Sequence, residues 1–220
     1  MEITYLGHSS FKLRGKNASV VIDPFDGGVV GLSYPKVAAE IVVVSHDHPD
    51  HNAVDKVYGT AVREKPFLIA APGEYEVNGI SVFGFSVWHD KKEGAERGKN
   101  MISVVHVDDV VVAHLGDLGH TLSDKIVEEM GQIDVLLVPV GGHYTIGPGD
   151  AVKVTTQIEP SIVVPMHYKV AGMKEAFDAL EPVEGFLKEM GVSDVRRETK
   201  LTVTALSLPE DREVVVLTYA

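Results

Sequence analysis

The sequence of 220 residues contains no cysteine at all. This absence excludes disulfide scaffolds, thiolate zinc sites, iron–sulfur clusters and a cysteine nucleophile. Basic residues are also scarce, because 20 lysines and arginines stand against 32 aspartates and glutamates, for a formal net charge of −12. A binder of long nucleic acid needs a basic surface to meet phosphates, so we expect no long nucleic acid as a partner.

Long hydrophobic runs are missing as well. A membrane-spanning helix needs roughly 20 apolar residues in a row, whereas the longest apolar run here, residues 135–140, has the length of a strand. The first residues lack the basic segment and long apolar segment of a secretory signal. We therefore expect a cytoplasmic protein with a small-molecule substrate and no membrane partner. The sequence does not define its oligomeric state.

Short apolar runs separated by glycine, proline and asparagine predict a chain rich in β-strands. The expected strands are 3–6, 11–14, 19–23, 41–45, 67–70, 80–87, 101–107, 110–115, 134–140, 162–165, 201–206 and 214–219. Asp108 and Asp109 predict a tight hairpin turn. Helices are expected from Thr121 or Ser123, over 151–158 and over 173–190, the last one broken or kinked at Pro182. Strands mixed with helices, without a linker, predict one α/β or α+β domain over residues 1–220.

Histidine is abundant, with ten residues in the chain. Residues 45–51 read Ser-His-Asp-His-Pro-Asp-His and directly follow the buried strand expected at 41–45. In a turn, His46 and His48 can point to one metal, while Asp50 and His51 can point to a second. Imidazole and carboxylate suit zinc, manganese or iron without any thiolate. A surface loop that is histidine-rich by chance is the alternative, and the position behind a buried strand favours the metal site.

Three further polar residues each follow the end of an expected strand: His89, Asp117 and His167. Taken singly, each also fits an ordinary role as a loop histidine, a turn former or a hydrogen-bonded strand-end residue. Strand ends that converge on one edge of a sheet bring distant residues together. These three residues are therefore candidates to complete the site.

Taken in order, these motifs resemble the metallo-β-lactamase fold superfamily, and the resemblance extends over essentially the whole chain. It implies a four-layer αββα sandwich with two divalent metal ions at one edge, zinc by preference and manganese or iron as alternatives. It also implies roles for individual residues: His46, His48 and His89 on the first metal, Asp50, His51 and His167 on the second, Asp117 bridging both, and Asp23 orienting the histidine loop by hydrogen bonds.

Within that superfamily, the segments 5–9, 72–76, 114–120 and 139–145 are similar to small stand-alone hydrolases that include the ascorbate-6-phosphate lactonases. The resemblance implies a metal-dependent hydrolase that activates water against a small ester, lactone or amide. Two alternatives are a metal-dependent phosphodiesterase or nuclease acting on small nucleotides or RNA, and a non-catalytic metal-binding regulatory module.

Several residues remain candidates for the pocket. His8, in a Gly-His-Ser turn, and His120, three residues past Asp117, are expected either to line the pocket or to make structural hydrogen bonds. Asp50 and His143 are candidates for proton transfer. Arg97 lies in the polar loop 90–100 and is expected to meet an anionic substrate, unless that loop is only a solvated hairpin.

Overall fold

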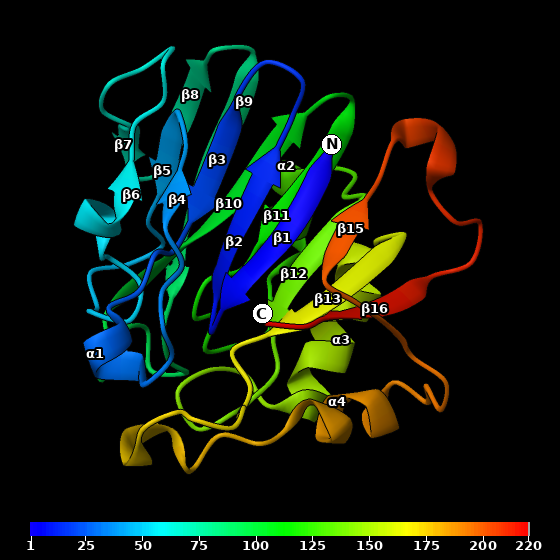
Figure 1. Ribbon diagram of the computed structural model, residues 1–220. Helices are drawn as coiled ribbons and strands as arrows, with labels where there is room; N and C mark the ends of the chain where they lie inside the picture. Colours follow the sequence, from blue (N-terminus) through cyan, green and yellow to red (C-terminus); the bar gives the residue numbers. More distant parts are fainter. Residues whose placement is uncertain (220) are drawn as a thin grey trace.

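Two β-sheets packed face to face dominate the structure, a computed structural model that describes residues 1–219 (Figure 1). In the described residues the first sheet has six strands in the order β15-β1-β2-β3-β5-β7. These strands are β15 (Lys200–Thr202), β1 (Glu2–Gly7), β2 (Ser10–Arg14), β3 (Ser19–Ile22), β5 (Ile41–Val43) and β7 (Phe67–Ile69).

The second sheet has eight strands within residues 1–219, in the order β14-β16-β13-β12-β11-β10-β9-β8. These are β14 (Arg196–Glu198), β16 (Glu213–Leu217), β13 (Ile162–Met166), β12 (Val135–Pro139), β11 (Val110–His114), β10 (Lys99–Val107), β9 (Ile80–Trp88) and β8 (Gly73–Val77). The turn between β10 and β11 is the predicted hairpin, in which Asp108 and Asp109 both have positive φ, at 50° and 63°.

Strand direction decides where the polar residues of the first sheet gather. β1 and β3 both pair antiparallel with β2, and β3 pairs parallel with β5. The carboxyl ends of β1, β3 and β5 therefore lie at the same edge of the sheet. His8, Asp23 and the segment 46–51 all follow these ends.

The second sheet repeats this arrangement. β9 and β11 both pair antiparallel with β10, and β11, β12 and β13 are parallel. The carboxyl ends of β9, β11 and β13 consequently share one edge, where His89, Asp117 and His167 follow them. Because the two sheets face each other, all six polar segments meet at one end of the sandwich.

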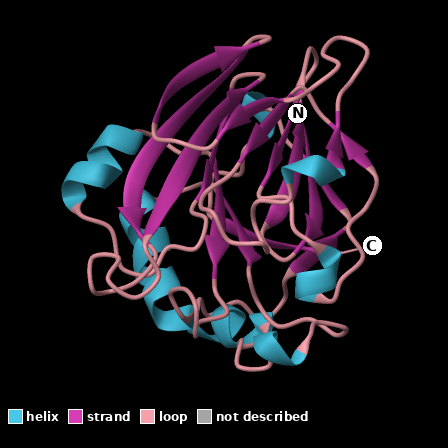
Figure 2. Ribbon diagram, turned by 90° about the vertical axis from the view of Figure 1, so that its left-hand side faces the viewer, coloured by secondary structure: helices cyan, strands magenta, loops and turns pink. Residues whose placement is uncertain are grey.

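The main core lies between the sheets and consists of alternate residues of the central strands. Ile3, Phe11 and Val20 of the first sheet pack against Val112 and other residues of the second. The outer face of the second sheet is also buried, under helices α2 (Asp124–Met130), α3 (Pro148–Ile158) and α4 (Val183–Glu189), which Figure 2 shows along the margin of the strands. β12 and β13 are thus buried on both faces, which explains their continuous apolar sequences.

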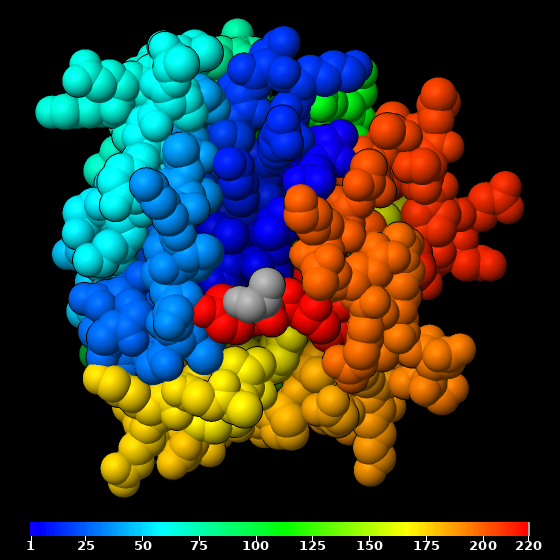
Figure 3. Space-filling view, viewed as in Figure 1, coloured from blue at the N-terminus to red at the C-terminus, as the bar shows by residue number. Residues whose placement is uncertain are grey.

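The outer face of the first sheet carries only a thin layer. It consists of the ribbon β4 (Val37–Ala38) with β6 (Val57–Tyr58) and the single turn η1 (Val54–Lys56). A second small cluster joins helix α1 (Gly27–Val30) to the turn η2 (Glu175–Phe177) and includes Phe25 and Leu180. Figure 3 shows these two segments side by side, in blue and yellow. The described residues contain no helix that is long and apolar enough to cross a membrane.

The α/β class and the sandwich are confirmed, but two expected elements are wrong. The helix expected over 173–190 is only η2 and α4, because the main chain of Glu181 pairs with Gly141 and Lys169 and Pro182 then begins α4. The strand expected over 201–206 ends at Thr202, since Thr204 caps the turn η3 (Ala205–Ser207). The pattern also missed β8 and α1.

Gly119 fixes the chain at the end of β9, so a side chain there should damage the fold. A Cβ at Gly119 would lie 2.4 Å from the backbone nitrogen of Asp90 and from the carbonyl carbon of His89. We expect Gly119→Ala to lower the free energy of unfolding by about 1–3 kcal/mol, measured by urea denaturation.

Gly149 in α3 provides the matched control, because a Cβ there meets no atom within 4 Å. Gly149→Ala should be neutral or stabilising by up to about 1 kcal/mol. Equal stabilities of the two variants would contradict the packing described for Gly119.

Candidate metal centre

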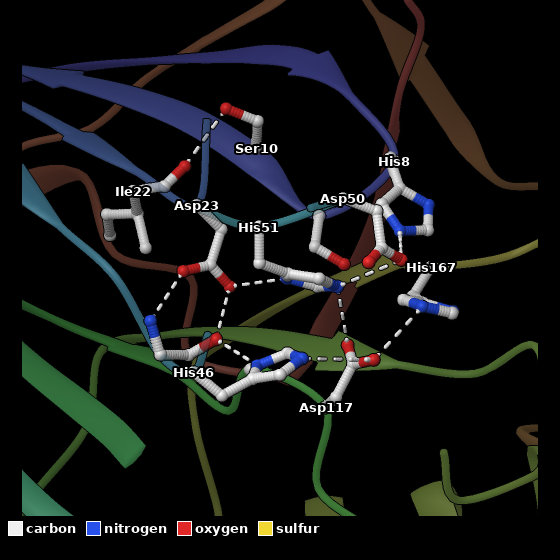
Figure 4. A network of polar contacts seen from close by, with 12 residues as sticks. His8, Ser10, Ile22, Asp23, His46, Asp50, His51, Asp117 and His167 are labelled. Atoms are coloured by element: carbon white, nitrogen blue, oxygen red, sulfur yellow. Dashed lines mark hydrogen bonds and ion pairs between the residues drawn. The ribbon is translucent and has the colours of Figure 1, made fainter. Parts of the chain in front are cut away.

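Asp23 organises the histidine loop from the end of β3. Its carboxylate is fully buried and accepts hydrogen bonds from the Ser45 N–H at 2.7 Å and the Ser45 hydroxyl at 2.6 Å. The Nδ1 of His51 lies 2.9 Å from the same carboxylate (Figure 4). An ionised carboxylate only accepts, so Nδ1 of His51 carries a proton, and Nε2 is the nitrogen that would bind a cation after releasing the proton it holds in the cation-free protein.

The same chain of hydrogen bonds orients His46. Because the Ser45 hydroxyl donates to Asp23, its oxygen accepts from Nδ1 of His46, 2.9 Å away. The Nε2 of His46 is therefore unprotonated and points away from Asp23. One buried carboxylate thus sets the tautomers of two histidines, which is the usual task of an outer carboxylate at a metal site.

Asp117, which follows β11, lies at the centre of the histidines. Its Oδ2 is 3.3 Å from Nε2 of His89 and 3.3 Å from Nε2 of His167, and its Oδ1 is 3.3 Å from Nε2 of His51. The Nε2 of His46 is 3.9 Å from Oδ2. Side chains from both sheets therefore surround one carboxylate, as Figure 4 shows for His46, His51 and His167.

Several of these buried atoms have no hydrogen-bond partner in the described chain: Nε2 of His46, His51 and His167, and Oδ1 of Asp117. Burying so many polar atoms without partners is costly. The atoms lie close together without aiming hydrogen bonds at one another. A cation between them would satisfy all of them, so the residues fit a metal.

The possible ligand atoms fall into overlapping groups, each with all atoms within 4.8 Å of one another. The groups are His46, His48 and His89; His46, His51 and Asp117; and His8, Asp50, His51 and His167. The seven ligands proposed from the sequence are all among them, and His8 joins Asp50, His51 and His167. The structure therefore brings together the residues that the sequence singled out.

His8 contacts Asp50 through its side chain and His167 through its backbone. Its Nε2 is 3.1 Å from Oδ2 of Asp50, and its carbonyl accepts the N–H of His167 at 2.9 Å. The residue is fully buried and has φ of 55°, in the left-handed region that non-glycine residues seldom adopt. His8 is thus part of the site.

The electrostatics of the cluster follow from burial and close neighbours. Burial lowers the pKa of His46 to about 3 and that of His8 to about 4, and nearby histidines lower both further. Burial alone would raise the pKa of Asp117, but His167 and His51 hold it well below its usual range. Burial alone would lower the pKa of His51, but Asp117, Asp23 and Asp50 raise it well above its ordinary value. In the absence of a cation, the carboxylates thus share a proton with His51.

A carboxylate also organises the loop after His89. Asp90 is buried and accepts hydrogen bonds from four backbone N–H groups, of Lys92, Gly94, Glu96 and Arg97, at 2.7–3.1 Å. Burial would raise the pKa of this carboxyl, but the four donors lower it to about 2. The loop is therefore an ordered structure built around one charge rather than a loose solvated hairpin.

A cavity of about 330 Å³ opens onto the cluster and contains Arg97. Its lining is His48, Pro49, Asp50, His89 and Asp117 together with Val29, Glu96, Arg97, Tyr144, Ala176 and Phe177. The sequence did not single out Val29, Tyr144 or Phe177, because they come from helix α1, the loop after β12 and the turn η2, which share no period.

His120 and His143 do not lie where the pocket interpretation put them. Nε2 of His120 accepts the N–H of Trp88, and its Nδ1–H donates to the carbonyl of Thr121. His120 therefore stabilises the end of β9 by hydrogen bonds and does not line the cavity. His143 is exposed, and its neighbour Tyr144 lines the cavity in its place. A role for His143 in proton transfer stays a prediction.

Comparison with known proteins now defines the family. A family profile described as "Beta-lactamase superfamily domain" matches residues 2–167. A UPF0173 metal-dependent hydrolase of Methanopyrus kandleri is 31% identical, over 76% of this chain and 84% of the relative. The chain belongs to the metal-dependent hydrolases of the metallo-β-lactamase superfamily. The resemblance seen in the sequence is thereby confirmed.

Two further relatives match nearly the whole chain. A UPF0173 metal-dependent hydrolase of Korarchaeum cryptofilum is 32% identical over 97% of this chain and all of the relative. A Thermotoga maritima structure, named as a candidate Zn-dependent hydrolase of the superfamily, is 38% identical with a TM-score of 0.78, over 98% of this chain and 97% of that one. The fold and the family therefore apply to the chain as a whole.

The buried histidines predict how the metal-free hydrolase responds to acid. The pKa values of His8 and His46 lie below their ordinary value of 6.5 in the folded state, so the unfolded chain takes up these protons first. Stability should fall as the pH drops from about 6.5 toward 4. Each kcal/mol lost lowers the melting temperature by about 2–4 °C, which thermal unfolding of chelator-treated protein will detect.

The variant His8→Gln removes one of these titrating groups and should show a shallower fall over the same range. A melting temperature that stays level or rises between pH 6.5 and 4.5 would contradict the buried, neutral state of these histidines.

Proposed function

We propose that this hydrolase binds two divalent cations and uses them to hydrolyse a small ester, lactone or amide. The convergence of unpartnered histidine nitrogens on Asp117 supports the proposal most strongly. The proposed ligands are His46, His48 and His89 for the first cation, Asp50, His51 and His167 for the second, and Asp117 for both.

The donor set favours zinc, with manganese or iron as alternatives. It consists of imidazole nitrogens and carboxylate oxygens, which these metals accept, and it lacks the thiolates of most structural zinc sites. The cavity leaves the cluster open on one side, as a catalytic metal site requires. Cations held by these residues would lower the pKa of a bound water toward neutrality and would polarise the oxygen of the bond under attack.

Asp50 is the proposed proton carrier. Its side chain is 18% exposed, whereas that of Asp117 is 3% exposed, so Asp50 is the more open carboxylate beside the cavity. Burial would raise its pKa, but His51 and His8 hold the pKa well below its usual range. Asp50 is therefore ionised at neutral pH, and its carboxylate is available as an acceptor beside the cavity.

The size of the cavity bounds the substrate. About 330 Å³ is near the lower end of ligand pockets and corresponds to roughly ten waters at ~30 Å³ each. A small molecule fits this space, whereas a folded nucleic acid does not. We therefore propose a small metabolite as substrate.

Metal depletion and a small substrate panel test the function. We expect protein stripped by a chelator to take up two equivalents of zinc or manganese, measured by mass spectrometry of the metal. The reloaded enzyme should hydrolyse a lactone or a 4-nitrophenyl ester, and the stripped enzyme should not.

The other outcomes separate the competing functions. Activity confined to bis-4-nitrophenyl phosphate would establish a phosphodiesterase in place of an esterase. Two bound metals without any activity would favour a metal-binding regulatory module. A protein that takes up no metal would overturn the proposal as a whole.

Asp23 provides a test of the site that does not depend on substrate. In Asp23→Asn the amide NH2 replaces either Oδ1, where it faces the Ser45 N–H, or Oδ2, where it faces both the Ser45 hydroxyl and Nδ1 of His51. A hydrogen bond that orients the loop is lost in either case, and the histidines are held less firmly. Metal affinity should fall about 10–100-fold in calorimetric titration. Asp134→Asn is the control, because this buried carboxylate accepts the N–H of Val111 far from the cluster. Equal metal affinities of the two variants would rule out the orienting role.

A further inference from the structure

Two cavities meet at the cluster, and together they describe a substrate with two unlike parts. Besides the cavity of about 330 Å³, a second one of about 380 Å³ lies on the other side of His48. The residues common to both linings are His48 and Arg97. A molecule that reaches the cluster therefore passes Arg97 whichever cavity it occupies.

Arg97 is held in place at both ends. Its backbone N–H donates to Asp90 at 2.8 Å, as part of the four-donor arrangement described above. Its guanidinium lies over the ring of Tyr144, 5.6 Å from the centroid. Tyr144 is itself fixed by a hydrogen bond from its hydroxyl to the carbonyl of Ala176 at 2.7 Å. A side chain ordered in this way loses little entropy when it binds a ligand.

The charge of Arg97 has no partner in the described part of the chain. The arginine ion pairs within 4.0 Å there involve Arg196 and Arg197. The neighbouring Glu96 is already paired, since it accepts from Nζ of Lys92 at 2.6 Å. Lys99 adds a second cation to the lining of the larger cavity. A guanidinium stacked on an aromatic ring keeps its N–H edge free for a carboxylate or phosphate.

One wall of the smaller cavity is apolar. Val29 of α1 is 37% exposed, although it is a large hydrophobic residue, and Pro49, Ala176 and Phe177 continue this wall. The wall rests on the cluster of Phe25, Val30 and Leu180, so it is a supported surface. Exposed apolar surface beside a polar cluster is typical of a ligand site.

We propose that the substrate carries an anionic group, a carboxylate or phosphate, which Arg97 binds, next to an apolar segment that contacts Val29 and Phe177. This inference rests on the proposed hydrolase function and names its substrate class. Arg97 is then a specificity-determining residue, and the bond to be broken lies between the two parts, over the metal cluster.

Two esters that differ only in charge test the proposal. Mono-4-nitrophenyl glutarate carries a carboxylate where 4-nitrophenyl valerate has a methyl group. After subtraction of the spontaneous rate, kcat/KM of the metal-loaded enzyme should be at least about tenfold higher for the glutarate ester, since a charged hydrogen bond is worth that factor. A preference for valerate would overturn the proposal.

Variants on the same loop assign the preference to Arg97. Arg97→Gln should abolish the preference by raising KM for the glutarate ester, with little change for valerate, and Arg97→Lys should restore part of it. Lys91→Gln is the matched control, because Lys91 pairs with Asp150 and lines neither cavity. A preference that persists in Arg97→Gln would come from the metals and would overturn the role of Arg97.

Binding of the stable anilides separates this inference from the hydrolase function. Calorimetry of the chelator-treated enzyme, which should not cleave amides, with N-(4-nitrophenyl)glutaramate and N-(4-nitrophenyl)valeramide should show the same tenfold difference, and Arg97→Gln should remove it. A difference in affinity between the two anilides, without cleavage of any ester, would contradict the hydrolase function and support the anion site. Cleavage of both esters at equal rates would do the reverse.

Discussion

The buried carboxylate of Asp23 is the constraint on which the rest of the site depends. A charge with no exposure to water is destabilising unless donors surround it, and here three donors from the chain after β5 do so. These hydrogen bonds fix where the histidine loop leaves the sheet and which nitrogen of His46 and His51 faces Asp117. Two of the side chains that converge on Asp117, those of His46 and His51, are therefore oriented by the protein before any ligand arrives.

The metal centre is also a joint between the two sheets. His8 follows the first sheet, and its carbonyl accepts the N–H of His167, which follows the second. The next residue, Ser9, makes a similar link between the sheets, because its carbonyl lies 2.8 Å from Nε2 of His114 on β11. The site edge is thus closed by hydrogen bonds that do not need a cation. Cations bound there would add a link between the same two sheets, so metal affinity and stability are coupled.

Much of this arrangement could be predicted from the sequence, because the informative residues follow strand ends and strand ends are visible as apolar runs. Residues that follow strand ends in this way are the segment His46–His51, His89, Asp117 and His167. The helix expected over 173–190 failed because long-range pairing of the Glu181 backbone outweighed local preference. The cavity wall of Val29, Tyr144 and Phe177 could not be predicted, since nothing in one segment indicates that the other two lie beside it.

The loop 90–97 has a property that matters for how such a hydrolase diversifies. Its fold depends on backbone groups gathered around Asp90, so the side chains at the intervening positions are mostly exposed and carry little of its stability. Those positions can change without disturbing His89, which directly precedes the loop. The proposed selectivity of this loop and the proposed metal binding of His89 therefore lie on adjacent residues that can vary independently, so that side chains could be exchanged on an unchanged loop backbone.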